Sequence, residues 1–389
     1  MLKTWKKAIS LVLVFALSMM VCVSAFADEN VDSVKDSGVK DSAITYISEA
    51  DAVLLANQCI KTSVATDDHC SWSDQTTIKN ATPIYDLNQQ IGYYLFRLNE
   101  GYIFVSASSE NPKVVAYSYD ANFIADNMLK RTNSVITSKD KIVYAGGLDF
   151  YKQEDNTYKE LDTDVTVKTS DISNMKKRYN NTIKNITSNK AQKNLNTIKA
   201  QKNENTLLSS TLSDESYTIP NLWDVDYQVY VTGDFPGYSN HCTPTAATNF
   251  IEYWGTKADN YKSALWSGSV FQDLYTDLKT NVGKKGTYLS DILPGIQKYS
   301  ESRNVELGVG CTFKATSYDD CVYYIQRGPF LLLLWNDMSP KEYKNHTVLA
   351  VGTGNHYLRI LDGWSVSKSN FFDSDYALAD NADGVSETF

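Results

Sequence analysis

The chain has 389 residues, with 46 acidic and 37 basic side chains and a formal net charge of −9 at pH 7. This length is sufficient for two ordinary domains with apolar cores. The acidic balance disfavours a nucleic-acid partner, since such proteins carry clustered positive charge.

The N-terminus has the three parts of a secretory signal peptide. Three lysines precede an apolar run at residues 8–23, which ends at Ala25-Phe26-Ala27 before Asp28. The run is too short, and its end too cleavable, for a membrane-spanning helix. We therefore expect residues 1–27 to be removed and the remainder to be secreted, either extracellular or associated with the cell surface, with no membrane segment. Loss of the three lysines leaves a net charge of −12.

Residues 28–164 are expected to form a small mixed domain. Ser48 and the acidic residues after it are a capping signature for a helix over 52–59. Two β-rich runs, 91–98 and 102–107, are joined by Asn99-Glu100-Gly101 and so predict a hairpin, with a further strand at 112–118.

Residues 165–214 differ abruptly in composition. Nine Lys and Arg lie between 168 and 204 against two acidic residues, Asp171 and Glu204, and aromatic residues are almost absent. Such a segment buries too little apolar surface to offset its ordering entropy. It is predicted to be a basic mobile linker or a frayed helix, and easily cut; an anchor for an anionic polymer is the minor alternative.

Residues 215–389 are rich in aromatic side chains and are predicted to form a second domain. One helix follows Cys242 and ends near Gly255. The other expected elements are a helix at 290–299 and strands at 329–335, 346–352 and 357–361. A helix packed on an antiparallel sheet makes this an α+β fold.

Cysteine spacing points to one unpaired thiol. After signal removal five cysteines remain, and two close pairs could form small disulfide loops outside the cell: Cys59 with Cys70, and Cys311 with Cys321. Cys242 is then left over. A leftover thiol in an exported chain is usually intermolecular or reactive.

Cys242 is expected at a helix N-terminus, because Pro244 suits a first turn and an apolar helical face follows. There the helix dipole favours a thiolate. A thiolate nucleophile needs a base and an orienting group, and His346 opens a strand whose hairpin partner ends at Asp362. The alternative reading is structural: a small buried thiol, a strand-end histidine and a turn aspartate.

The blocks around these residues resemble papain-fold bacterial cysteine peptidases of the streptopain and bacteriocin-processing types. The matching stretches are Cys242-Thr-Pro-Thr-Ala-Ala, His346-Thr-Val-Leu-Ala-Val-Gly, and Asp362-Gly-Trp364. The resemblance implies Cys242 as nucleophile, His346 as base and Asp362 in place of the usual orienting Asn. Residues 100–118 similarly resemble the inhibitor-like propeptide domain of streptopain zymogens.

The resemblance leaves three positions open. Trp364 is displaced by one residue from the tryptophan that shields the pair, and His241 replaces the usual Gly before the nucleophile. By analogy Gln228 is the candidate oxyanion donor beside the Cys242 N–H, with Asn221 or Asn240 as substitutes.

The sequence therefore predicts a secreted cysteine endopeptidase made as a zymogen, acting on peptide or protein substrates and inhibited by its own propeptide domain. No cofactor is expected, and no metal, because no His/Cys/Asp cluster has ligand spacing. Two alternatives are a transglutaminase-like acyltransferase and a non-catalytic papain-fold binding module.

Overall fold

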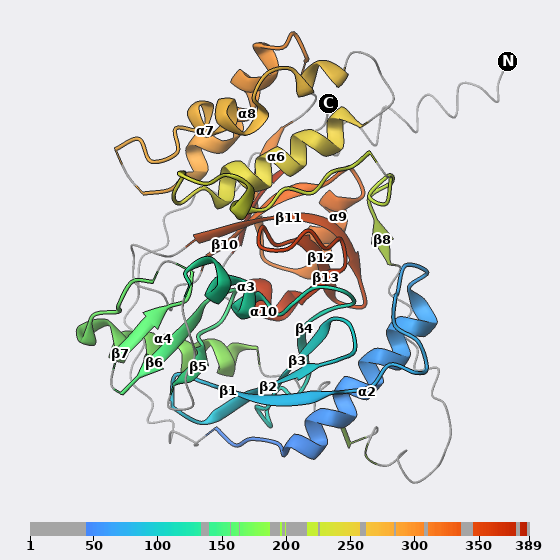
Figure 1. Cartoon of the computed structure of the whole chain (residues 1–389), viewed down its shortest axis with the longest axis vertical. Helices are drawn as coiled ribbons and strands as arrows, with labels where there is room; N and C mark the ends of the chain where they lie inside the picture. Colours follow the sequence, from blue (N-terminus) through green and yellow to red (C-terminus); the bar gives the residue numbers. More distant parts are fainter. Residues whose placement is uncertain are drawn as a thin grey trace, which may run out of the picture. The chain divides into compact units, whose positions relative to one another are not determined.

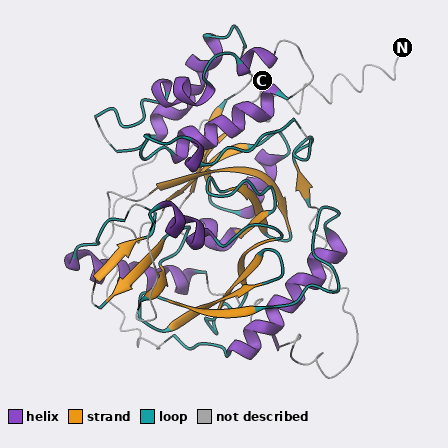
Figure 2. Ribbon diagram, in the orientation of Figure 1, coloured by secondary structure: helices purple, strands orange, loops and turns teal. Residues whose placement is uncertain are grey.

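The computed structural model is an α+β fold in which helices pack on an extended, mainly antiparallel sheet (Figures 1 and 2). It describes residues 44–386 with gaps at 134–139, 156, 163, 187–194, 197–198, 200–215, 225, 257–261, 284, 307–309, 336–344 and 379–381. The predicted signal peptide lies outside the described residues.

The first half contains a long helix and a curled set of strands. Helix α2 (Glu49–Thr66) is capped by Ser48, whose Oγ accepts the Asp51 N–H at 3.2 Å. The other elements are β1 (Asn80–Tyr85), β2 (Ile91–Arg97), β3 (Tyr102–Ser106), β4 (Val114–Ser118), α3 (Ile124–Arg131), β5 (Lys141–Tyr144), β6 (Phe150–Glu154), β7 (Thr157–Glu160) and α4 (Thr169–Asn185). Antiparallel pairing of β2 with β3 confirms the predicted hairpin.

In the second half, helix α6 packs against a central antiparallel sheet, and shorter helices accompany it. The helices are α6 (Cys242–Gly255), α7 (Val270–Asp277), α8 (Leu289–Glu301), α9 (Tyr318–Ile325) and α10 (Ser374–Leu378). The strands are β8 (Tyr217–Thr218), β9 (Cys311–Ala315), β10 (Phe330–Trp335), β11 (Asn345–Gly354), β12 (Tyr357–Leu361), β13 (Asn370–Asp373) and β14 (Ala382–Ser386). Helix α6 contacts β10 and β11, so the predicted α+β arrangement of helix on sheet is confirmed.

The hairpin β11–β12 is closed by a two-residue turn. Asn355 and His356 both have positive φ, 53° and 65°, as a type I′ turn requires. Strand β10 is buried along Phe330–Leu334, which explains its unbroken apolar sequence.

The two halves share one sheet. Strand β4 of the first half pairs antiparallel with β13 of the second, so Ser118 lies opposite Asn370 and Ala116 opposite Phe372. Tyr117 stacks on Phe371 with ring centroids 4.5 Å apart. The sequence predicted two domains but gave no sign of this pairing, because neither strand marks its partner locally.

Two ion pairs strengthen this junction. Arg359, only 5% exposed, binds Asp67, which follows α2. Lys113 binds Asp373 at 2.7 Å, and burial raises the pKa of that carboxyl to about 6 despite the lysine. Each of these largely buried carboxylates therefore has a positively charged partner that offsets the cost of removing its charge from water.

The expectation of a mobile linker over 165–214 is wrong for its first third. Helix α4 occupies Thr169–Asn185 and buries Met175, Tyr179 and Ile183 at helical spacing. The Tyr179 hydroxyl lies 3.0 Å from that of Tyr93. Composition was misleading here because three well-spaced apolar side chains suffice to dock an otherwise polar helix.

The two predicted disulfides are not formed: none of the five cysteines among the described residues is in a disulfide bond. Cys321 is fully buried in α9, whereas Cys311 opens strand β9 opposite Ser386. Cys59 lies within α2 and Cys70 in the loop after it. Sequence proximity did not bring these side chains into a bonded pair, which needs a specific Cβ geometry.

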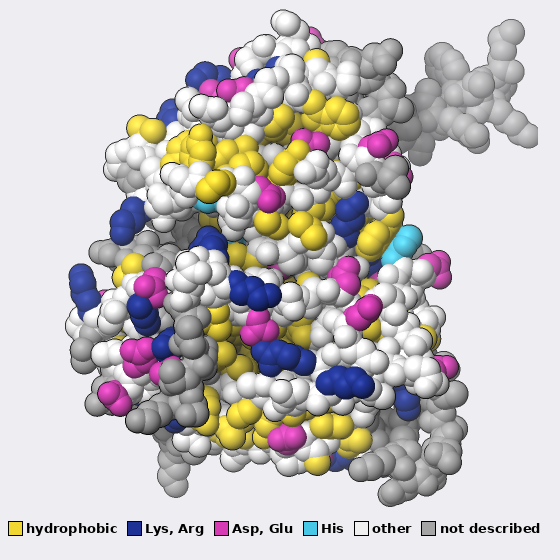
Figure 3. Space-filling view, viewed as in Figure 1, with side chains coloured by type: hydrophobic (Ala, Val, Ile, Leu, Met, Phe, Trp, Pro, Cys, Tyr) yellow, Lys and Arg dark blue, Asp and Glu magenta, His cyan; other side chains and the backbone are white. Residues whose placement is uncertain are grey.

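No helix among the described residues is long and apolar enough to cross a bilayer. On the face shown in Figure 3, basic and acidic side chains are interspersed, and apolar atoms gather over the helices of the second half.

The docking of α4 can be tested by its central aromatic residue. Tyr179→Ala should lower the free energy of unfolding by about 3 kcal/mol, as expected for a buried aromatic side chain reduced to alanine. Lys177→Ala, on the exposed face of the same helix, should change it by less than about 0.5 kcal/mol. Urea denaturation followed by circular dichroism measures both; equal effects would show that α4 does not pack.

Candidate active site

Helix α6 presents its first residue at the surface of an otherwise covered helix. Of its 14 residues only Cys242 and Glu252 are not buried. The N-cap residue His241 makes no side-chain capping hydrogen bond. The His241 side chain therefore does not cap the first-turn N–H groups, and the helix dipole favours an anion at Cys242.

The strand β11 brings His346 to this helix end. The hydroxyls of Thr243 and Thr347 lie 2.7 Å apart and are buried, and each belongs to the residue directly after a candidate catalytic residue. The imidazole of His346 hydrogen-bonds the Cys242 sulfur, which also accepts the Thr347 N–H. The structure thus brings together the two residues that the sequence placed 104 positions apart.

The pKa of each group is shifted in the direction that favours its own charged form. Burial would raise the pKa of the Cys242 thiol, but the hydrogen bond and charge of His346 outweigh burial and lower it. Burial would likewise lower the pKa of His346, and the same interaction raises it. Both shifts favour the charged form of the pair, thiolate with imidazolium.

Asp362 contacts His346 through its main chain. The Asp362 carbonyl oxygen accepts from His346 Nε2 at 2.9 Å. Because a carbonyl only accepts, Nε2 carries a proton, and Nδ1 is left for the sulfur. The Asp362 carboxylate instead accepts the N–H groups of Trp364 and Ser365, both at 2.8 Å. The hydrogen bond of the imidazole is thus made to the backbone carbonyl, while the carboxylate and His346 interact through their charges, so the orienting role of the carboxylate stays a prediction.

Trp364 covers the imidazole despite its shifted sequence position. Its ring stacks on that of His346, with centroids 3.9 Å apart and planes within 12°. Its indole Nε1 donates to Asp162 at 3.1 Å, and Asp162 also pairs with Arg131. Asp162 and Arg131 come from the first half of the chain, and no local motif marks either of them.

His241 does not face the thiol. It is 6% exposed, and its Nδ1 lies 3.1 Å from Thr245 Oγ1. Its ring meets that of Phe271 edge-on at 5.5 Å, and burial lowers its pKa. The side chain therefore packs within an aromatic group, where burial disfavours its charged form.

Gln228 is far from the position predicted for it. It is exposed and lines a cavity with Thr248 and Glu252, about 9 and 15 Å along the helix axis from Cys242 at 1.5 Å per residue. Of the two substitutes, Asn240 donates its amide to Asn281 Oδ1 at 3.2 Å and Asn221 is exposed, and their role as oxyanion donors stays a prediction. The Cys242 N–H is the oxyanion donor that this geometry offers.

A hydrogen-bonded thiol and imidazole, one on a helix and one on an antiparallel sheet, are the arrangement that nucleophilic catalysis by a thiol requires. Residues 223–379 match a family model described as Peptidase C39 like family, and residues 45–141 match one described as Spi protease inhibitor. The predicted resemblance, a cysteine-peptidase domain after an inhibitor-like domain, is thereby confirmed.

Two solved structures are similar to the chain at low identity. One is described as a C39-like peptidase from Bacillus anthracis, at 12% identity, 44% coverage of this chain, 98% of that chain and a TM-score of 0.29. The other is a fragment of prointerpain A from Prevotella intermedia, at 10% identity. That match covers 80% of this chain and 98% of the fragment, with a TM-score of 0.35. No curated protein matches the chain.

Alkylation of Cys242 should report the thiolate directly. The rate of labelling by iodoacetamide should rise with pH as the thiol ionises. The midpoint of this rise should lie below the ordinary thiol pKa of about 8.5, because His346 lowers the thiol pKa. His346→Ala should move the midpoint upward, since burial is then unopposed. His356→Ala, in the β11–β12 turn, should not move it. Mass spectrometry locates the label; identical midpoints in the parent protein and His346→Ala would contradict the pairing.

Proposed function

We propose that the chain is a secreted cysteine endopeptidase synthesised as a zymogen. The observation that carries the proposal is the hydrogen-bonded pair of Cys242 and His346 at the N-terminus of α6, with the thiol pKa lowered and the imidazole pKa raised. The matches to a C39-like peptidase family and to a protease inhibitor support the same class. The streptopain-type sequence blocks favour an endopeptidase, and residues 1–27 favour export.

The reaction follows from this pair. The Cys242 thiolate attacks the peptide carbonyl carbon, and the oxyanion that forms accepts the Cys242 N–H at the helix end. The protonated His346 gives its Nδ1 proton to the leaving amine, the C–N bond breaks, and a thioester remains. His346 then takes a proton from water, whose oxygen attacks the thioester; a carboxylic acid leaves and the thiolate returns.

His346 needs a fixed ring for both proton transfers. The Asp362 carbonyl and the Trp364 ring supply it, one in the plane of the imidazole and one against its face. The Trp364 ring also limits the access of water to the pair, which strengthens the attraction between thiolate and imidazolium.

The first half of the chain is proposed to inhibit the second. Asp162 binds the indole of Trp364, which lies directly on His346. The Arg131–Asp162 pair is close enough to influence the pKa of His241, the residue before the nucleophile. Together with the β4–β13 pairing, these contacts hold the inhibitor-like domain beside the thiol. Cleavage in the basic segment between the halves, near residue 210 and outside the described residues, would release the mature enzyme.

Activity should depend on the thiol and yield hydrolysis. Cys242→Ala should abolish both labelling by an irreversible cysteine-protease inhibitor and cleavage of casein by the activated protein. Mass spectrometry should show water added at the cut peptide bond; amine incorporation without cleavage would favour an acyltransferase instead. Casein cleavage retained in Cys242→Ala would refute the proposal.

Asp362 should matter less than a triad carboxylate. Asp362→Asn keeps the main-chain carbonyl and an oxygen for the Trp364 and Ser365 N–H groups, so kcat/KM of the activated enzyme should fall less than about tenfold. Trp364→Ala uncovers the imidazole and should cost more. Replacing a triad carboxylate by an amide lowers the catalytic rate on the order of ten-thousandfold. A loss of that size in Asp362→Asn would show that the carboxylate itself takes part in the mechanism.

Removing the contact from the inhibitor-like domain should activate the uncut chain. Asp162→Ala breaks the hydrogen bond to Trp364 and the pair with Arg131, so full-length protein should be labelled faster at Cys242. Asp155→Asn, in the exposed β6–β7 turn, is the matched control and should behave like the parent. Unchanged labelling of Asp162→Ala would mean that this contact does not restrain the site.

A further inference from the structure

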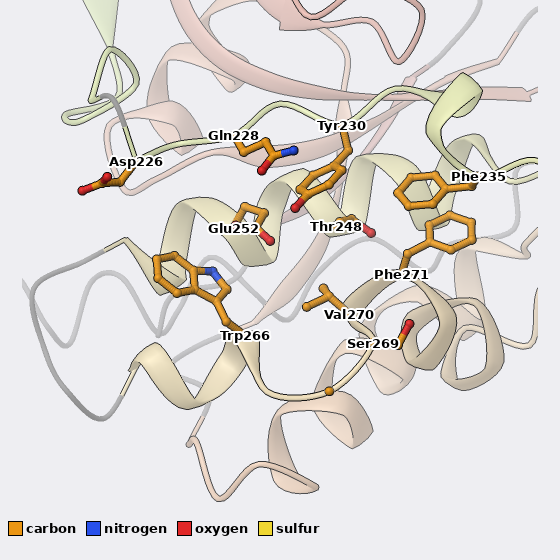
Figure 4. Close-up of a pocket in the computed structure, with 11 residues that line it drawn as sticks. Asp226, Gln228, Tyr230, Phe235, Thr248, Glu252, Trp266, Ser269, Val270 and Phe271 are labelled. Atoms are coloured by element: carbon orange, nitrogen blue, oxygen red, sulfur yellow. The ribbon is translucent and has the colours of Figure 1, made fainter.

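A cavity of about 430 Å³ opens beside the second and third turns of α6, away from the thiol (Figure 4). Its walls come from the segment before α6, from α6 itself and from the residues leading into α7. Such a volume lies in the range of sites for small ligands. Nothing in the peptidase mechanism above uses it.

Glu252 is one of two carboxylic side chains of the described residues that line this cavity. Together with Cys242 it is one of the two residues of α6 that are not fully buried. Burial raises the pKa of its carboxyl to about 7. Across the described residues its carboxylate has neither a hydrogen bond nor an ion pair, and Asp226, a second carboxylate, lies at one end of the cavity (Figure 4).

Aromatic rings flank the carboxylate. Figure 4 shows Glu252 between Trp266 and Tyr230. The Trp266 indole lies so close over the backbone of α6 that a Cβ on Gly255 would fall 2.1 Å from its Nε1, yet the side chain remains 37% exposed. One face of the indole is thus fixed against the helix while the residue borders the cavity. Rings in such positions attract cations.

The protein supplies no cation of its own to this carboxylate in the part of the chain that is described. No Lys or Arg lines the cavity. The nearby Arg303 is already engaged: it binds Asp273 at 2.6 Å, donates to the Ser267 carbonyl at 3.0 Å and stacks on Tyr299 at 3.6 Å. A largely buried, unpaired carboxylate is unfavourable unless a positive group joins it.

The lining disfavours anions and apolar ligands. An anion would be repelled by Asp226 and Glu252, and an apolar ligand would desolvate Glu252 without compensation. No group of three or more His, Cys, Asp or Glu side chains able to hold a metal exists among the described residues. We propose that this cavity binds one organic cation, a guanidinium or ammonium group carried by a small amine or by an Arg or Lys side chain of a polypeptide.

Binding can be measured without any peptidase activity. Full-length Cys242→Ala protein is titrated calorimetrically with N-acetylarginine amide and with N-acetylcitrulline amide, which has nearly the same shape but no charge. We expect saturable binding of the arginine compound and at least tenfold weaker binding of the citrulline compound. Adding Glu252→Gln should weaken binding of the arginine compound at least tenfold, and adding Trp266→Leu about threefold or more.

Controls separate loss of the site from loss of the fold. Glu301→Gln, an exposed carboxylate on α8, should leave binding unchanged. Glu252→Gln removes an unpaired buried charge, so its urea midpoint should not fall. Tighter binding of agmatine than of N-acetylarginine amide would identify small amines as the ligand source, and the reverse would identify polypeptide side chains. Equal binding of the citrulline compound, full binding by Glu252→Gln, or no saturable binding of either guanidinium compound would overturn the proposal.

Discussion

The whole site depends on how the start of α6 docks against strand β11. The buried contact between the Thr243 and Thr347 hydroxyls, 2.7 Å apart, joins the residues that directly follow Cys242 and His346. With the two backbones fixed at this point, the thiol and the imidazole meet at a helix end whose N–H groups are not capped by the His241 side chain. The resulting attraction overcomes the effect of burial on both pKa values.

The same sheet that positions His346 also carries the inhibitor-like half of the chain. Pairing of β4 with β13 extends the sheet across the boundary, and β13 pairs in turn with β12, the strand that leads to Asp362. This pairing brings the two halves close enough for Asp162 to accept a hydrogen bond from Trp364. The side chain of Trp364 therefore lies between Asp162, in the first half of the chain, and the ring of His346.

Helix α6 serves two distinct environments. Its buried surface anchors the helix in the core, and its two uncovered positions are a thiol at the first residue and a carboxylate in the third turn. His241, Phe235 and Phe271 form a packed aromatic group between them, and the Phe235 and Phe271 rings stack at 3.6 Å. Because both residues stand on one helix, the thiol of Cys242 and the carboxyl of Glu252 keep a fixed separation.

The sequence by itself determined the elements whose signals are local: the helix after Cys242, the β2–β3 and β11–β12 hairpins, and the candidate residues Cys242 and His346. It did not determine contacts made through the backbone or across the fold. Residue type cannot reveal that Asp362 binds the imidazole through its carbonyl, because every residue has a carbonyl. Nor could composition show that α4 docks, that Gln228 lies near Glu252, or that Asp162 reaches Trp364. Those were decided by tertiary packing, which fixes distances between positions that the sequence leaves independent.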